Sequence, residues 1–184
     1  LAKKLGAKVI GGIDGKGIYR LKFPDEGIAD SAYDRLESMD DVDTDYNYNI
    51  PKPPTPVASP EITAFPIDLN PAPLSDDEGI IVAIIDTAVQ NAGSPFGDFL
   101  LDQLSVVGET VNNSINPTHG THVLDALFTG VAASTDNTET IIRVLPVDVY
   151  GVNDSTTTYD LTAGTSLAVE NGATVINISS GGTD

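Results

Sequence analysis

The most restrictive feature of the sequence is a concentration of proline between residues 51 and 78. Proline lacks a backbone N–H and has a fixed φ, so a proline-dense segment forms neither a helix nor a central strand and favours an extended tether. We therefore expect a linker at residues 51–78, between a small module at residues 1–50 and a larger domain at residues 79–184. Eight of the twelve prolines lie in this segment: Pro51, Pro53, Pro54, Pro56, Pro60, Pro66, Pro71 and Pro73.

The pattern of residues 1–50 predicts a β-α-β module. Apolar and polar residues alternate over residues 17–23 and again over residues 42–50, as in half-buried strands. Between them, residues 28–39 carry apolar side chains at helical spacing. A module of about 50 residues has only a marginal core, so we expect it to be stabilised by packing against a partner surface.

The pattern of residues 79–184 predicts an α/β domain with a doubly wound parallel sheet, because continuous apolar strands alternate with helices. Sites in such sheets form at the carboxyl ends of the strands. The predicted strands cover residues 79–85, 104–107, 141–149 and 173–178, and the predicted helices cover residues 120–131 and 157–171.

The charge is strongly negative and unevenly distributed. The net charge is −18, and residues 53–184 contain a single basic residue, Arg143. Such a field repels phosphate backbones and anionic lipids, so we expect no nucleic-acid or membrane partner. The acids fit a solubility adaptation of an exported or salt-tolerant protein. Calcium binding is the alternative for this acidic region, although no EF-hand-like loop supports it, and we predict no other cofactor.

Other features bear on location. The chain has no cysteine, which excludes disulfides and cysteine-based sites. It also has no apolar run of about 18 residues that could span a membrane. Residue 1 is a leucine and no signal-like segment follows it, so we expect any targeting segment to be absent from these residues.

Three motifs of the larger domain contain chemically useful residues. Asp86 ends the first apolar strand, His119 and His122 lie in Thr-His-Gly-Thr-His-Val, and residues 175–182 read Val-Ile-Asn-Ile-Ser-Ser-Gly-Gly. Each has an ordinary structural explanation when taken alone. A strand-end Asp commonly forms a turn, and a His at a helix start is commonly a structural donor.

Together and in this order, the motifs resemble those of the subtilase family of serine proteases. The resemblance covers residues 79–184 and includes a Val-Leu-Pro-Val strand within residues 143–147. It implies that His119 is the general base of a Ser-His-Asp triad, and that Asp86 fixes its tautomer and stabilises the imidazolium. His122 would be a structural residue. A metal pair of His119 and His122 is the competing interpretation, but no third ligand is evident.

The resemblance also implies two segments that flank the substrate, which would be a polypeptide. Ser179, Ser180 and Gly181 would offer backbone groups and one wall of the first specificity pocket. Asp154, Ser155 and Thr156 would form the opposite strand. Residues 1–50 are similar to subtilase propeptides. That similarity implies a module that docks on the peptidase domain as chaperone and inhibitor, a linker that is cut on maturation, and a secreted protein.

The family's Gly-Thr-Ser nucleophile motif does not follow residue 182. Residues 164–166 read Gly-Thr-Ser but lie within a predicted helix and precede the Ser-Ser-Gly-Gly motif, so we reject them as the nucleophile. We therefore expect a serine endopeptidase whose serine lies in a missing or separate C-terminal part, without which this chain is inactive. The alternative is a catalytically inactive, peptide-binding or inhibitory relative, which three departures from the family pattern favour: Ala88, Leu124 and Asp125. Residues 154–156 also lack the family's usual glycines, which suggests an altered cleft.

Overall fold

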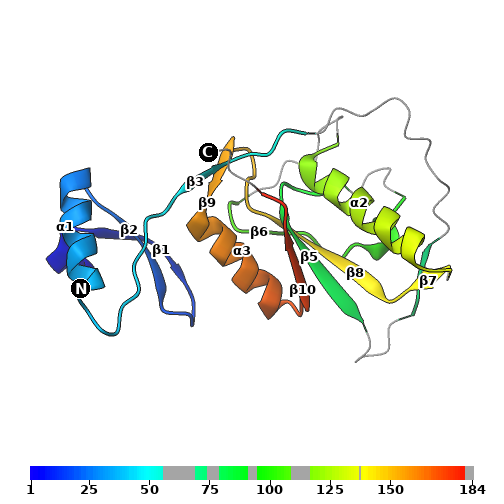
Figure 1. Cartoon of the computed structure of the whole chain (residues 1–184), viewed down its shortest axis with the longest axis horizontal. Coiled ribbons are helices and arrows are strands. Elements are labelled where there is room, and N and C mark those ends of the chain that lie inside the picture. The colour runs from blue at the N-terminus through cyan, green and yellow to red at the C-terminus, as the bar shows by residue number, and fades with distance from the viewer. Residues whose placement is uncertain (56–68, 74–78, 91–94, 109–116, 137, 181–184) are drawn as a thin grey trace. The chain divides into compact units, whose positions relative to one another are not determined.

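The computed structural model describes residues 1–55, 69–73, 79–90, 95–108, 117–136 and 138–180. It divides into two compact units, Leu1–Tyr48 and Asn49–Asp184. Figure 1 shows the first unit in blue and the second from cyan to red. The expected boundary at residue 50 thus differs by two residues from the division into units.

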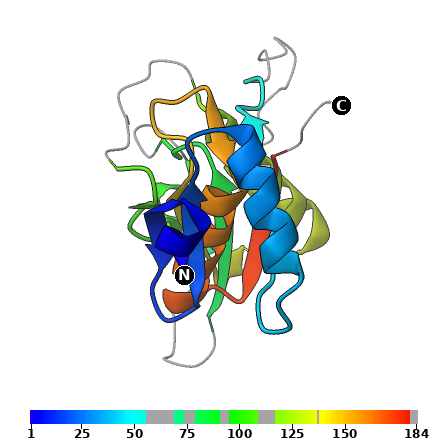
Figure 2. The same cartoon turned by 90° about the vertical axis from the view of Figure 1, so that its left-hand side faces the viewer.

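The first unit is a hairpin with one helix. The 3-10 helix η1 (Ala2–Leu5) precedes strands β1 (Lys8–Ile13) and β2 (Ile18–Lys22), which pair antiparallel, and helix α1 (Glu26–Glu37) follows. The turn uses Gly15 and Gly17, both with positive φ. The side chain of Asp25 caps α1 by accepting from the N–H of Ile28 at 2.9 Å. Figure 2 shows η1, the hairpin and α1 in a view turned by 90° from that of Figure 1.

The β-α-β prediction for this unit is wrong in two places. The predicted strand at residues 17–23 is β2, but its partner is β1, which precedes it and which the sequence pattern did not reveal because Gly11 and Gly12 interrupt its apolar residues. Residues 42–48 form no strand. Their alternation has another cause, because Tyr46 stacks on Tyr33 of α1 with ring centroids 4.9 Å apart.

The second unit contains the predicted parallel sheet. Its order is β10 (Val175–Ile178), β5 (Ile80–Asp86), β8 (Ile142–Asp148) and β6 (Leu104–Ser105), and all three pairings are parallel. The apolar runs that predicted β5 and β8 are needed because both strands are buried over their last five residues. Since the strands are parallel, the carboxyl ends of β5 and β8 meet at one edge, where Asp86 and Asp148 are in register.

Helices pack against both faces of this sheet. On one face, Ile84 and Val144 contact a cluster that includes Leu124 and Phe128 of α2 (His119–Ser134). On the other, Ile85 and its neighbours contact Ala168 of α3 (Thr158–Glu170). Figure 1 shows the two helices beside the sheet. The short 3-10 helix η2 (Gly97–Phe99) adds Phe99 to the α2 side.

Parts of the segment expected as a linker pair with strands of the second unit. Strand β3 (Asn49–Pro51) is antiparallel to β9 (Ser155–Thr157), and β4 (Asn70–Pro71) is parallel to β7 (Glu139–Thr140). Both short strands lie in two-stranded sheets, where a proline can be accommodated because one side of the strand makes no ladder hydrogen bonds. The rest of the expected linker, residues 56–68 and 74–78, lies outside the described residues.

Candidate active site

Asp86 is the last residue of β5, and its side chain is fully buried. Its Oδ1 accepts a hydrogen bond from the backbone N–H of Thr87 at 2.6 Å. Burial raises the pKa of Asp86 above its ordinary value, because a carboxylate is poorly solvated there; the Thr87 N–H and His119 partly offset this effect. Asp86 is therefore a carboxylate whose charge depends on a nearby donor.

His119, the first residue of α2, is that donor. Its Nδ1 lies 2.8 Å from Oδ2 and 3.0 Å from Oδ1 of Asp86. A carboxylate partner favours the proton on Nδ1, so Nε2 is left as the basic nitrogen of the ring. The His119 side chain is 17% exposed, whereas that of Asp86 is 0% exposed. The pair thus has the orientation of a general base that a buried acid holds in one tautomer.

Backbone contacts between α2 and the end of β5 set the separation of this pair. The Gly120 N–H donates to Oγ1 of Thr87 at 2.9 Å. A Cβ on Gly120 would lie 2.3 Å from the carbonyl oxygen of Thr87, so only glycine allows the helix to approach so closely. Thr87 and Gly120 could not be identified from the sequence as determinants of the site, because their role depends on this tertiary contact.

Threonines fix the start of α2. Thr118 is the N-cap residue: its Oγ1 accepts from the Thr121 N–H at 3.3 Å and donates to the Ala88 carbonyl. The Oγ1 of Thr121 accepts from the N–H of Gln90 at 3.0 Å. Thr118 was not predicted as the N-cap residue, although a threonine just before an expected helix is a recognised start signal.

The departures from the family pattern fit the structure without conflict. Ala88 is buried, and no residue other than glycine has positive φ in the described ranges, so its methyl group causes no backbone strain there. Leu124 is fully buried in the core between α2 and the sheet. Asp125 is partly buried, which raises its pKa, and the neighbouring His122 lowers it again in part. With these three residues in place, His119 still lies beside Asp86.

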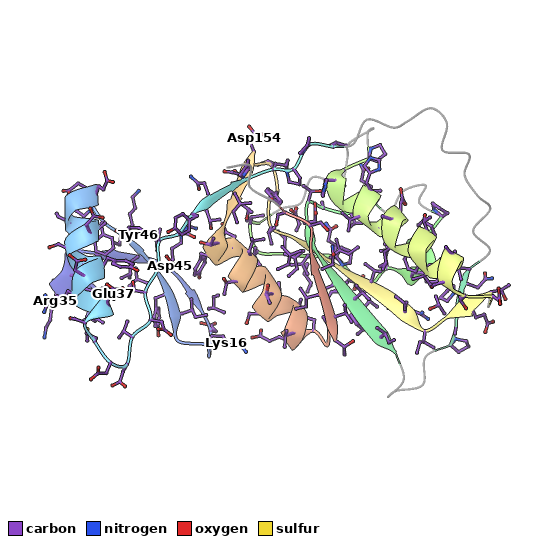
Figure 3. All side chains as sticks on the ribbon, in the orientation of Figure 1. Lys16, Arg35, Glu37, Asp45, Tyr46 and Asp154 are labelled. Carbon is purple, nitrogen blue, oxygen red and sulfur yellow. The ribbon has the colours of Figure 1, made fainter. Side chains whose placement is uncertain are left out.

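Of the predicted substrate-flanking residues, Asp154, Ser155 and Thr156 lie at or next to β9. Asp154 is exposed, and its side chain points outward in Figure 3. In the ladder with β3, Ser155 is opposite Pro51 and Thr156 is opposite Ile50. This edge of β9 therefore already carries an extended chain.

The residues expected on the opposite side follow β10. Ser179 accepts a hydrogen bond from the Asn177 side chain at 2.7 Å. The Ser180 hydroxyl is buried and makes no hydrogen bond of standard geometry with the described residues. Burial raises the pKa of the neighbouring Tyr150 phenol above its ordinary value. The nearby Ser180 hydroxyl partly offsets this effect, and the negative charge of Asp86 adds to it. Gly181 lies outside the described residues.

Ser166, the serine of the rejected Gly-Thr-Ser sequence, lies in α3 as predicted. Its hydroxyl donates to the Glu170 side chain at 3.3 Å. Gly164 packs so tightly that a Cβ there would lie 2.8 Å from Val149. Since α3 covers the face of the sheet opposite to α2, Ser166 is not next to the imidazole of His119.

The described part of the chain contains neither a cluster of metal ligands nor a membrane-spanning helix. No three His, Cys, Asp or Glu side chains there are grouped so that they could hold a metal ion. None of the helices there has the length and apolarity needed to cross a bilayer. Calcium binding remains a prediction from composition.

The comparisons with known proteins agree with this geometry. Residues 77–184 match the Subtilase family, and this match covers more than half of the chain. No curated protein matches the chain. With Asp86 and His119 paired at the carboxyl end of a parallel sheet, and with the family match spanning that sheet, the chain belongs to the subtilase family.

Proposed function

We propose that this chain supplies the Asp and His of the catalytic triad of a serine endopeptidase. The observation that carries the proposal is the 2.8 Å contact between His119 Nδ1 and the buried carboxylate of Asp86. The serine would come from a polypeptide part beyond these 184 residues, which would also complete the doubly wound sheet. Without that part the chain would be inactive.

In the proposed reaction, the serine Oγ attacks the carbonyl carbon of the scissile peptide bond. His119 Nε2 takes the serine proton and later transfers it to the leaving amine. The carboxylate of Asp86 accepts from Nδ1–H throughout and stabilises the imidazolium that forms between these two proton transfers. Water then hydrolyses the acyl-enzyme by the same sequence of proton transfers. Metal ions take no part in these steps.

The substrate would be a polypeptide that binds in extended form between β9 and residues 179–181. The antiparallel pairing of β3 with β9 supports this, because it shows that the edge of β9 accepts a strand. Ser155 and Thr156 would pair with the substrate backbone once β3 has left.

A regulatory role is part of the proposal. Since residues 49–51 occupy the edge that a substrate would use, they would block it until they are displaced. The first unit would act as a propeptide that docks on the peptidase domain, the linker would be cut on maturation, and the enzyme would be secreted. If residues 1–50, produced separately, neither bind nor inhibit the completed peptidase, this regulatory role is excluded.

The inactive, peptide-binding alternative is not favoured, because Ala88 and Leu124 are accommodated without separating His119 from Asp86. Hydrolysis separates the two functions. In the complete protein, His119→Ala should lower the hydrolysis of a denatured polypeptide by a factor on the order of 10⁶, because the whole triad depends on its general base. The matched control is Ser166→Ala, which should leave activity unchanged. A parent protein that binds polypeptide but never cleaves it would contradict the proposal.

A further inference from the structure

Lys52 lies directly after β3 and continues its pairing with the segment before β9. Its backbone N–H donates to the carbonyl of Asp154 at 2.8 Å. Its side chain extends over the ring of Tyr150, with Nζ 5.9 Å from the ring centroid. The same ammonium group lies 3.5 Å from the carbonyl oxygen of Gly151. An aromatic face and a carbonyl oxygen are both attractive to a cation.

Burial and hydrogen bonds hold the surface under Lys52 in place. The side chain of Tyr150 is fully buried, and its hydroxyl donates to the carbonyl of Pro51 at 3.4 Å. Asp148 holds the turn that carries the ring and the carbonyl: its Oδ1 accepts from the N–H groups of Tyr150 at 2.9 Å and Gly151 at 2.8 Å. The two hydrogen bonds to Asp148 do not involve β3 or Lys52, so they hold the turn that carries the ring independently of that strand.

The charge of the second unit also favours a cation at this place. Lys52 and Arg143 are the two basic residues of residues 49–184. Arg143 has a structural role, since its guanidinium donates to the carbonyls of Ala72 at 2.6 Å and Ile142 at 2.9 Å. The ammonium group of Lys52 is therefore placed over Tyr150 in a unit that is otherwise rich in carboxylates.

The prolines around Lys52 fit a strand that binds by alternate backbone groups. Lys52 uses its N–H toward Asp154, whereas its neighbours Pro51 and Pro53 have no N–H to offer. In an antiparallel ladder, successive residues face alternate sides, so prolines at these positions remove no bond to the segment at β9. Residues 50–52 thus have the backbone pattern of a bound peptide in a defined register.

We infer that Tyr150 and Gly151 form a subsite for a basic side chain, and that the peptidase selects polypeptides with Lys or Arg at the position that Lys52 occupies here. This inference rests on the proposed function, because it names the substrate class of the same cleft. Tyr150 is then a specificity-determining residue, and Asp148 is a positioning residue that acts through it.

The first experiment uses the full chain and measures the amide exchange protection of residue 52, corrected for intrinsic rate. Lys52→Gln should lower this protection by about threefold to tenfold, the range expected for a cation over an aromatic ring. Lys52→Arg should restore it, and Lys22→Gln in β2 is the control for loss of a positive charge. Unchanged protection in Lys52→Gln would overturn the inference.

Tyr150 variants separate the ring from the hydroxyl. Tyr150→Phe keeps the ring face, so Lys52→Gln should lower protection by the same factor in this background as in the parent. Tyr150→Leu removes the ring face, so Lys52→Gln should have little effect there. An equal effect of Lys52→Gln in the Leu background would overturn the role of the ring. If Tyr150→Leu does not fold, the peptide experiment below still tests the subsite.

In the second experiment, a separate peptide is added to the full chain carrying Lys52→Gln. In this variant, β3 should compete less strongly with the peptide for the edge of β9. The probes are the capped peptide Asn-Ile-Pro-Lys-Pro-Pro and a twin with norleucine in place of lysine. The lysine peptide should bind about threefold to tenfold more tightly. Equal binding would overturn the basic subsite and leave the proposed cleft standing. If neither peptide binds, both the subsite and the proposed peptide cleft are contradicted.

Discussion

The two units of the chain differ most in how much apolar surface they bury. Among the described residues of the first unit, Leu5, Ala32 and Leu36 form the whole buried cluster. The second unit has a cluster on each face of its sheet, with large side chains such as Phe99 and Phe128 completely buried. A unit with a small core has a small free energy of unfolding. A core on both faces of a sheet, in contrast, can hold side chains from separate elements in fixed positions.

This difference in buried apolar surface explains why the paired Asp and His belong to the second unit. Asp86 and His119 come from a strand and a helix, and the core between β5 and α2 holds these elements together. Surface contacts dominate the first unit instead, for example the hydrogen bond from Tyr46 to Asp30 at 2.7 Å. The predictions below test this contrast.

The largest effects are expected from truncating each core. Phe128→Ala should destabilise the second unit by about 3–5 kcal/mol, because it removes a fully buried ring that stacks on Phe96. Leu36→Ala should cost the first unit about 2–4 kcal/mol and unfold it, because few other buried side chains remain. Urea titration followed by NMR signals of each unit measures both. A first unit that stays folded in Leu36→Ala would contradict the claim that its stability depends on this small core.

A smaller loss of stability is expected when a methyl group is added at the contact between α2 and the end of β5. Gly120→Ala should destabilise the second unit by about 2–3 kcal/mol and disrupt the pairing of His119 with Asp86, because the new Cβ meets the Thr87 carbonyl. The urea midpoint and the His119 imidazole NMR signals report the two effects.

Gly130→Ala is the matched control in the same helix. A Cβ at Gly130 has no atom within 4 Å, so alanine there should be neutral or stabilise the helix by up to about 1 kcal/mol. Equal losses of stability at both glycines would show that the close approach to the Thr87 carbonyl is not what requires glycine at position 120.

Asp125→Asn tests partial burial of charge in α2. Burial raises the pKa of Asp125 in the folded state, so the fold loses stability as the pH rises from the ordinary Asp pKa through this raised value. Asp125→Asn should therefore raise the melting temperature at pH 7 by about 2 °C and leave it unchanged near pH 3. Asp102→Asn, at an exposed acid, controls for the removal of negative charge alone. A gain at pH 7 no larger than the control's would contradict the explanation.

The smallest effect is expected at the surface of the first unit. The hydrogen bond to Asp30 raises the pKa of Tyr46 to about 12. A tyrosinate absorbance titration of the parent minus that of Tyr46→Phe should show a single step near this pH. Because the folded state keeps this proton longer, the contact loses its stabilising effect as the pH rises from 10 toward 12. A step near pH 10 would mean that the contact is not formed in solution.

The same contrast decides how much of the fold could be predicted. The strands predicted at residues 79–85 and 141–149 correspond to β5 and β8, because burial on both faces demands continuous apolar runs. The strand predicted at residues 42–50 is wrong over residues 42–48, because this exposed Tyr-rich segment alternates for reasons of surface contact; only its last two residues lie in β3. Where burial is weak, periodicity no longer reports secondary structure.

The candidate site was predictable only in part. Asp86 and His119 could be found because they stand in recognisable motifs, and their pairing follows from the sheet and α2. Tyr150 and Lys52 could not, because their contact joins segments that are 98 residues apart and neither has a distinctive neighbourhood in the sequence. A residue whose role depends on one tertiary contact leaves no local pattern to read.

The most direct test of the central claim is labelling by a fluorophosphonate that reacts with activated serines, followed by intact mass measurement. In the complete protein, or in a mixture of this chain with a polypeptide that supplies the proposed serine, we expect one label on a serine outside residues 1–184. We also expect that His119→Ala abolishes labelling, whereas Ser166→Ala does not. No labelling of the parent protein, or labelling that persists in His119→Ala, would contradict the claim that Asp86 and His119 serve a serine peptidase.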